Sequence, residues 1–483
     1  MTRYGPGQIQ LWFWVAICSF YTGCSKPGKN SGSPVVVSPP TPSGITYYLT
    51  TPDKSSLLSR QSTALDFGTI SNSLPVISVD STQSFQSVDG FGYTLTSGSA
   101  VVINQLGPAE KNALLNELFG SGENSLGINF LRIGIGATDL SPSVYSYDDM
   151  PSGQTDPSLA QFNLTPDQPA LIPLLKLIVA INPSIKLLAT PWSAPAWMKD
   201  NGNSIGGSLV PANYPVYANY FVKYIQAMQA EGLPVYAITP QNEPLHPGNN
   251  PSMYMTAAQQ ASFIKNNLGP AFNAAGITTK IIVYDHNCDR PDYPLDILND
   301  ASARQYVDGA AFHLYAGNIT ALSQVYSAYP NKNIYFTEQY TASTGSFAGD
   351  LVWHLRNVII GSMRNYSRVA LEWNLATDPL YGPHTSGGCN TCLGALTIGS
   401  GTVTRNVSYY IIAQASRFVK AGSVRIASDD YGNLYSVAFL RPDGKKVLIV
   451  LNDDPAAQVF NIKFRNKMLA STLPGKAVAT YIW

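Results

Sequence analysis

Charged side chains are scarce in this chain, because only 12% of its 483 residues are Asp, Glu, Lys or Arg. The 30 acidic and 30 basic residues cancel, so no net charge attracts nucleic acid or an anionic membrane surface. Cysteine is rare too, with five residues, and no four ligands have the spacing of a zinc site. Neither a nucleic-acid partner nor a metal site is therefore expected.

Long apolar runs are also missing. The run at 11–21 is too short to span a bilayer, but it follows Arg3 and ends in small residues. This pattern predicts a secretory signal peptide at 1–23.

The end of this signal resembles a bacterial lipobox, in which Cys24 becomes the lipidated first residue of the mature chain. Tyr21 departs from that pattern, which prefers Leu, and the alternative is a plain signal peptide with an incidental Cys24. Residues 24–46 are rich in Ser, Pro and Gly and predict a flexible tether. We expect a secreted protein that is lipid-anchored to the bacterial cell envelope and touches the membrane only through this anchor.

What the chain does contain is an alternation of short β-rich runs with longer helical patterns, which is typical of βα units around a parallel sheet. Eight such runs predict a (β/α)8 barrel over 87–415. They lie at 87–93, 129–136, 186–193, 235–243, 280–285, 309–315, 333–340 and 368–374. A doubly wound sheet is the competing architecture, but no glycine-rich phosphate loop follows the first run.

Alternating strand patterns flank this region. They occupy 47–86 before it and 416–483 after it. We expect a β-sandwich built from both chain ends beside the barrel. Within the barrel region, Cys389 and Cys392 either form a structural disulfide or remain two thiols in a glycine-rich loop.

Two glutamates stand where barrel enzymes carry their chemistry, at the carboxyl ends of strands. The fourth run ends in Thr-Pro-Gln-Asn-Glu at Glu243, and the seventh contains Thr-Glu at Glu338. Hydrolysis of a glycoside needs such a pair, one acid to protonate the leaving oxygen and one carboxylate to attack the anomeric carbon. An arbitrary glutamate would be a solvated strand-end residue, but two at matching depth favour catalysis.

Several ordered motifs make the chain from residue 87 onward resemble glycoside hydrolase family 30, which contains glucosylceramidases and microbial β-1,6-glucanases. They are VDGFG at 88–92, LRI at 131–133, DLS at 139–141, ATPWSAPAWMK at 189–199, QNEP at 241–244, HLY at 313–315, FTE at 336–338 and EWNL at 372–375. The resemblance implies a (β/α)8 barrel with a β-sandwich, a retaining mechanism and no cofactor. It assigns Glu243 as acid/base and Glu338 as nucleophile.

The same resemblance implies eight substrate-binding or supporting residues. Asp139 and Trp192 would hold the far sugar hydroxyls, Asn242 the 2-hydroxyl, and Trp373 would form an aromatic wall. The remaining matches are His313 and Tyr315 beside the nucleophile, Arg132 as the partner that keeps it ionised, and Asn406 in a variable loop.

The substrate is expected to be β-1,6-glucan, because segments such as 48–54 and 287–293 look more like the bacterial glucanase branch. The alternative is glucosylceramide or a related β-glucoside or β-xyloside. An alternative of another class is a non-catalytic glycan-binding lipoprotein, which would be expected to lose one of the two glutamates. The sequence leaves endo or exo action and the oligomeric state open.

Overall fold

The computed structural model describes residues 44–483. The predicted signal peptide, Cys24 and most of the predicted tether lie outside these residues. No helix within 44–483 has both the length and the apolarity needed to cross a membrane.

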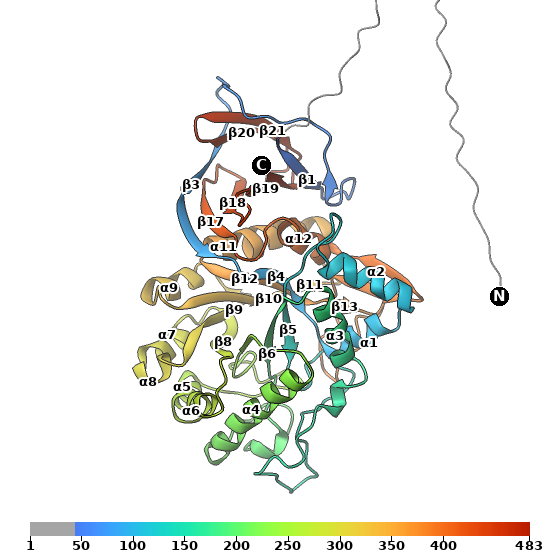
Figure 1. The fold of residues 1–483 in the computed structure, drawn as a ribbon, viewed down its shortest axis with the longest axis vertical. Coiled ribbons are helices and arrows are strands. Elements are labelled where there is room, and N and C mark those ends of the chain that lie inside the picture. The colour runs from blue at the N-terminus through green and yellow to red at the C-terminus, as the bar shows by residue number, and fades with distance from the viewer. Residues whose placement is uncertain (1–43) are drawn as a thin grey trace, which may run out of the picture. The chain divides into compact units, whose positions relative to one another are not determined.

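The centre of the fold is a closed barrel of eight parallel strands, as predicted, in the order β10-β12-β4-β5-β6-β7-β8-β9 (Figure 1). The strands are β4 (Gly90–Thr94), β5 (Phe130–Gly134), β6 (Lys186–Thr190), β7 (Ala237–Ile238), β8 (Lys280–Cys288), β9 (Val307–Gly317), β10 (Asn333–Glu338) and β12 (Ser367–Asn374). Each predicted run contains one of them or overlaps it. The interior is closed by Phe130, Leu188, Ala237, Ile282, Ala311, Tyr335, Val369 and Leu371, all fully buried.

Helices cover the outside of the barrel. They are α1 (Ser97–Asn104), α2 (Pro108–Phe119), α3 (Leu171–Ile181), α4 (Tyr214–Ala230), α5 (Ala257–Phe263), α6 (Gly269–Ala274), α7 (Asp292–Asn299), α8 (Ala301–Arg304), α9 (Ala321–Ala328), α10 (Phe347–His354), α11 (Ser362–Arg364) and α12 (Val407–Ser416). Local sequence sets their ends: Pro108 occupies the first turn of α2, and Thr256 with Gln259 forms a capping box before α5. The π-helical segments Ile264–Leu268 and Leu355–Gly361 interrupt two of the longer helical runs.

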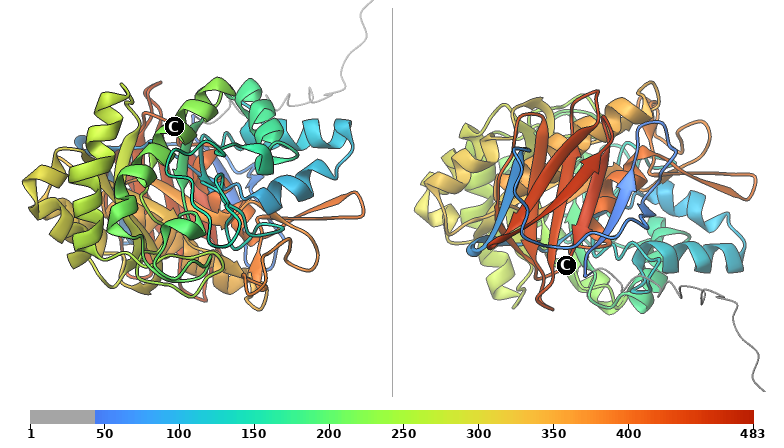
Figure 2. Two further views of the ribbon diagram at one scale, coloured as in Figure 1. Left: turned by 90° about the horizontal axis from the view of Figure 1, so that it is seen from below. Right: turned by 90° about the horizontal axis from the view of Figure 1, so that it is seen from above.

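The second layer is a nine-stranded sheet built from both chain ends, as predicted (Figure 2). Its order is β2-β1-β22-β19-β18-β17-β3-β20-β21. The strands are β1 (Thr46–Thr50), β2 (Ser59–Arg60), β3 (Val76–Ser87), β17 (Val424–Ser428), β18 (Leu434–Leu440), β19 (Lys446–Asn452), β20 (Gln458–Phe464), β21 (Lys467–Leu473) and β22 (Val478–Ile482). Because β3 pairs with both β17 and β20, the N-terminal segment lies inside this sheet.

Short strands shape the loops near the barrel mouth. They are β11 (Thr341–Ala342), β13 (Ala376–Thr377), β14 (Cys392–Leu393), β15 (Leu396–Gly399) and β16 (Thr402–Arg405). The pairing of β11 with β14 fixes the loop that carries Cys389 and Cys392 beside the end of β10. These two residues form a disulfide, which decides between the two alternatives left open by the sequence.

Candidate active site

Both glutamates singled out in the sequence line one cavity at the carboxyl-terminal mouth of the barrel, with a volume of about 270 Å³. Glu338 is the last residue of β10, and Glu243 lies five positions beyond the end of the short strand β7. The wall also contains Asp139, Trp192, His246, Asn249, Asn287, Tyr315, Tyr340, Trp373, Cys389 and Cys392. The wall therefore contains four of the predicted substrate-binding or supporting residues, namely Asp139, Trp192, Tyr315 and Trp373.

Arg132, from β5, lies fully buried beneath this cavity. One guanidinium nitrogen donates to Oε2 of Glu338 at 2.5 Å, and the other donates to Asp285 at 2.9 Å and to the side-chain oxygen of Asn242. The guanidinium also lies 4.7 Å from the ring centroid of Trp192. Arg132 is thus placed as the predicted cationic partner of Glu338, and it also orients Asn242.

Asp285 is the central acceptor of the site, and sequence reasoning missed it. Its two oxygens accept hydrogen bonds from Thr239 at 2.8 Å and Thr337 at 2.7 Å, and one lies 3.1 Å from Nε2 of His313. Burial would raise the pKa of Asp285, but the charge of Arg132 holds it far below its usual value. The signal was available, because Asp285 ends the fifth predicted strand just as Glu243 ends the fourth.

His313 and Tyr315 lie on β9, and their side chains point to the same side of the strand, as their spacing of two predicts. Nδ1 of His313 lies 3.3 Å from Oε1 of Glu243 and 3.6 Å from Oε1 of Glu338. The Tyr315 hydroxyl donates to Oε1 of Glu338 at 3.0 Å. Burial would lower the pKa of His313, but the charge of Glu338 and the hydrogen bond with Asp285 raise it to about 9.

The two carboxyl groups titrate together through this histidine. Burial raises the pKa of Glu338, and the charges of His313 and Arg132 oppose that rise without cancelling it. Burial would also raise the pKa of Glu243, but the neighbouring imidazoles of His286 and His313 lower it below its usual value.

Backbone strain is concentrated at the same place. Glu243, Tyr284 and Asp285 have φ angles of 43°, 77° and 61°, in the left-handed region that non-glycine residues seldom adopt. The β8–β9 pairing shifts register between Tyr284 and His286, and the amide of Glu243 donates to the carbonyl oxygen of Asp285. This irregularity turns Asp285 inward, toward Arg132 and His313.

One wall of the cavity is apolar, although it is close to a carboxyl group. Trp192 and Trp373 lie 5.4 Å apart between ring centroids, and the Cys389–Cys392 disulfide packs with them around Leu140. Burial, together with the charges of Glu338 and Glu243, raises the pKa of the nearby Asp139 to about 7. The disulfide is thus part of the cavity wall.

Asn406 lies outside the wall of this cavity. Its side-chain amide donates to the carbonyl oxygen of Gly394 and to the hydroxyl of Thr397, both at 2.8 Å. It lines a separate hollow of about 200 Å³ and is absent from the wall around Glu243 and Glu338. The substrate-binding role of Asn406 stays a prediction, whereas the structure shows that Asn406 precedes α12 and that its amide holds the loop leading into this helix.

Three further residues beside Glu243 were not revealed by the sequence, two from the loop after Glu243 and one from β8. His246 and Asn249 follow Glu243 in the chain, and the Asn249 amide donates to Oε2 of Glu243 at 3.4 Å. His286 lies 3.7 Å from the other oxygen of the same carboxylate. His246 and Asn249 lie beyond the predicted strand that ends at Glu243. His286 directly follows Asp285, the last residue of the fifth predicted strand.

The family comparison agrees with this architecture. The model of the glycosyl hydrolase family 30 TIM-barrel domain matches residues 88–419, and that of the family 30 β-sandwich domain matches residues 422–481. The chain belongs to glycosyl hydrolase family 30. It is therefore a glycoside hydrolase, which decides against the non-catalytic alternative.

Individual relatives of this family 30 chain fall into two groups. Endo-1,6-beta-D-glucanase BGN16.3 of Trichoderma harzianum is 36% identical over 403 residues, which cover 78% of this chain and 80% of the relative. The lysosomal acid glucosylceramidase of Mus musculus is 30% identical, with 83% and 81% covered. The solved structure of the endo-beta1,6-glucanase BT3312 superposes with a TM-score of 0.84 at 36% identity, covering 91% of this chain and 99% of that one.

Proposed function

We propose that this protein is a retaining endo-β-1,6-glucanase in which Glu338 is the nucleophile and Glu243 the acid/base. The observation that carries the proposal is the pair of carboxylates at the floor of one cavity, both within 3.6 Å of the same His313 nitrogen. The facing oxygens consequently cannot lie more than about 7 Å apart, which excludes most of the 6.5–9.5 Å range typical of inverting enzymes.

The chemistry then proceeds in two displacements. In the first, Glu338 forms a bond to the anomeric carbon while the bond to the leaving oxygen breaks and Glu243 protonates that oxygen. In the second, Glu243 takes a proton from water, the water oxygen bonds to the anomeric carbon, and the carboxylate of Glu338 leaves. No other reactant is consumed.

His313 has a place in this cycle because Glu338 must be ionised, and Glu243 protonated, at the moment of attack. Nδ1 of His313 lies within reach of both carboxylates and is the group positioned to carry the proton between them. Tyr315 and Arg132 would then stabilise the ionised Glu338 by hydrogen bonds.

The choice of β-1,6-glucan rests on the relatives. Two glucanases, one of them a solved structure, are 36% identical to this chain, against 30% for the glucosylceramidase. Glucosylceramide is the second candidate, because that relative is matched over an equal share of the chain. We further propose that Cys24 carries a lipid that holds the enzyme at the bacterial cell envelope, as the lipobox-like segment indicates.

The test is product release from the purified protein with β-1,6-glucan, glucosylceramide and an aryl β-glucoside. Oligosaccharides from the glucan establish the endo-glucanase, whereas glucose from glucosylceramide with an untouched glucan moves the protein to the second candidate. Glu243→Ala should lose about 10³-fold of its glucan turnover and keep most of its activity on aryl glucosides whose leaving group needs no proton. Equal losses on both substrates would refute the acid role of Glu243.

A further inference from the structure

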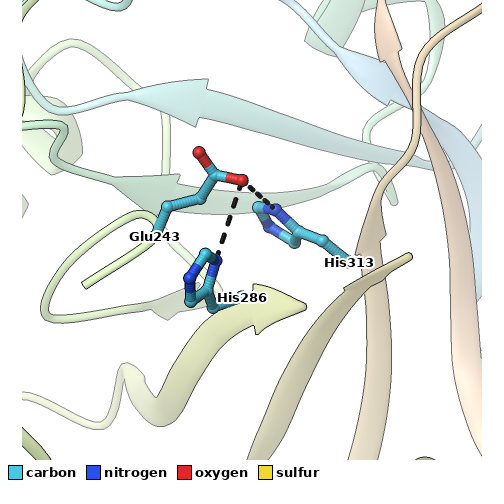
Figure 3. Close-up of side chains that lie close together, drawn as sticks. All are labelled: Glu243, His286 and His313. Atoms are coloured by element: carbon cyan, nitrogen blue, oxygen red, sulfur yellow. Dashed lines mark hydrogen bonds and ion pairs between the residues drawn. The ribbon is translucent and has the colours of Figure 1, made fainter. Parts of the chain in front are cut away.

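Two histidines approach the same carboxylate oxygen at the edge of the cavity. Figure 3 shows one ring nitrogen of His286 and one of His313 turned toward the same side-chain oxygen of Glu243. All three residues are at least nine-tenths buried. Nδ1 of His286 has no hydrogen-bond partner, which is costly for a buried polar atom. The catalytic cycle above does not use this nitrogen.

The spacing of the three side chains fits a tetrahedral metal ion. Zinc bound at about 2.1 Å keeps neighbouring ligand atoms about 3.4 Å apart. Oε1 of Glu243 lies 3.3 Å from Nδ1 of His313 and 3.7 Å from Nδ1 of His286, and the three ligand atoms all lie within 4.8 Å of one another. In residues 44–483 no other three His, Cys, Asp or Glu side chains converge in this way.

The surroundings supply what such a site needs beyond three ligands. Nε2 of His313 contacts the carboxylate of Asp285 at 3.1 Å, the partner that commonly orients a metal-binding imidazole. Oε1 of Glu338, 3.6 Å from Nδ1 of His313, or a water from the cavity can fill the fourth position. Imidazole nitrogens with a carboxylate oxygen suit zinc and similar dications.

We propose that Glu243, His286 and His313 form an inhibitory site for Zn²⁺ and related transition-metal dications. Metal ligands must be unprotonated, so the ion replaces the proton between His313 and Glu243. A carboxylate oxygen held by the ion can neither protonate a leaving group nor accept a proton from water. Zinc therefore blocks turnover. The inhibitory effect rests on the proposed role of Glu243, but binding of the ion does not.

The experiment measures inhibition and binding separately. Hydrolysis by the wild-type protein is titrated with ZnCl₂ and restored with EDTA, and Zn²⁺ binding is measured by equilibrium dialysis without substrate. We expect one bound ion per chain and reversible inhibition. His286→Gln should weaken both binding and inhibition at least about tenfold, since loss of a ligand costs at least as much as loss of a residue that only supports one.

The matched control is His246→Gln, which removes another histidine from the same cavity wall but leaves the three ligands. The inhibition of each variant is expressed as a fraction of that variant's own rate without zinc. We expect wild-type zinc affinity for the control. Equal zinc affinity of wild type and His286→Gln, or no binding at all, overturns the site. Binding that depends on His286 but leaves glucan hydrolysis unaffected overturns the inhibition.

Discussion

At the amino-terminal end of the barrel strands one buried carboxylate, Asp89, meets two cations, Lys186 at 2.8 Å and Arg368 at 2.9 Å. At the carboxyl-terminal end four buried carboxyl groups, those of Asp139, Glu243, Asp285 and Glu338, lie near one arginine, Arg132, and two histidines, His286 and His313. The first network neutralises its acid, whereas the second holds more acidic groups than cations. In barrel enzymes the residues at the amino-terminal end of the strands stabilise the fold, and those at the carboxyl-terminal end carry out the chemistry. The two ends of this barrel differ accordingly in their balance of acidic and basic groups.

The comparison predicts the largest loss of turnover for Glu338→Gln. Removing the nucleophile should lower kcat by about 10⁴-fold or more, while the free energy of unfolding stays equal or rises, because one carboxyl leaves a crowded site. Glucan hydrolysis and thermal melting measure the two effects. Glu372→Gln is the control, since Glu372 is equally buried on β12 but pairs with His354. It should keep wild-type turnover. A loss as large as that of Glu338→Gln would mean that burial of a glutamate, and not its place at the barrel mouth, explains the effect.

Asp139→Asn should show a smaller loss with a gain in stability. The loss in kcat/KM should be about 10- to 100-fold, the value of a hydrogen bond to a charged group. Folding raises the pKa of Asp139 to about 7, so the wild type loses stability as pH rises from 4 to 7. Melting as a function of pH should find the variant more stable at pH 7, with a difference that shrinks toward pH 4. A difference independent of pH contradicts this.

Opening the Cys389–Cys392 disulfide should have an intermediate effect. The bridge closes only a short loop, so its loss should cost less than about 3 kcal/mol of stability. Because both sulfurs line the cavity, Cys389→Ser/Cys392→Ser should raise KM about three- to tenfold and change kcat little. Steady-state kinetics measure this for the double variant and, as a second sample, for the wild type treated with a reductant that opens the same disulfide. An unchanged KM in both would make the bridge purely structural.

Asp89→Asn should have the smallest effect on turnover. Breaking its ion pairs should lower the free energy of unfolding by about 2 kcal/mol and leave kcat within about twofold. Burial would raise the pKa of Asp89, but Arg368 and Lys186 lower it overall. Its contribution to stability is therefore complete above the ordinary pKa of 3.8 and is lost as pH falls below it. Denaturation experiments at pH 7 and at acidic pH measure this. The difference in the free energy of unfolding between wild type and variant should be smaller at acidic pH.

Local pattern was enough for much of the fold and for the two catalytic candidates. Helices α2, α3 and α4 form where the helical patterns between the β-rich runs have apolar spacing and end residues that agree with burial. Glu243 and Glu338 were found because strand ends of a barrel meet at one mouth. The inward turn of Asp285, the approach of His286 to Glu243 and the position of Asn406 depended on a register shift and on loop contacts, which local pattern does not encode.

The sequence by itself determined the order of strands and helices, the participation of both chain ends in the sandwich, and the two glutamates with their aromatic neighbours. Only the tertiary structure decided that Arg132 joins Glu338 across 206 residues, that Asp285 links this arginine to His313, and that the disulfide lines the cavity. The physical reason is barrel closure. It fixes the distances between side chains that are remote in the chain. Burial then makes the pKa of each charged group depend on neighbours that local sequence does not predict.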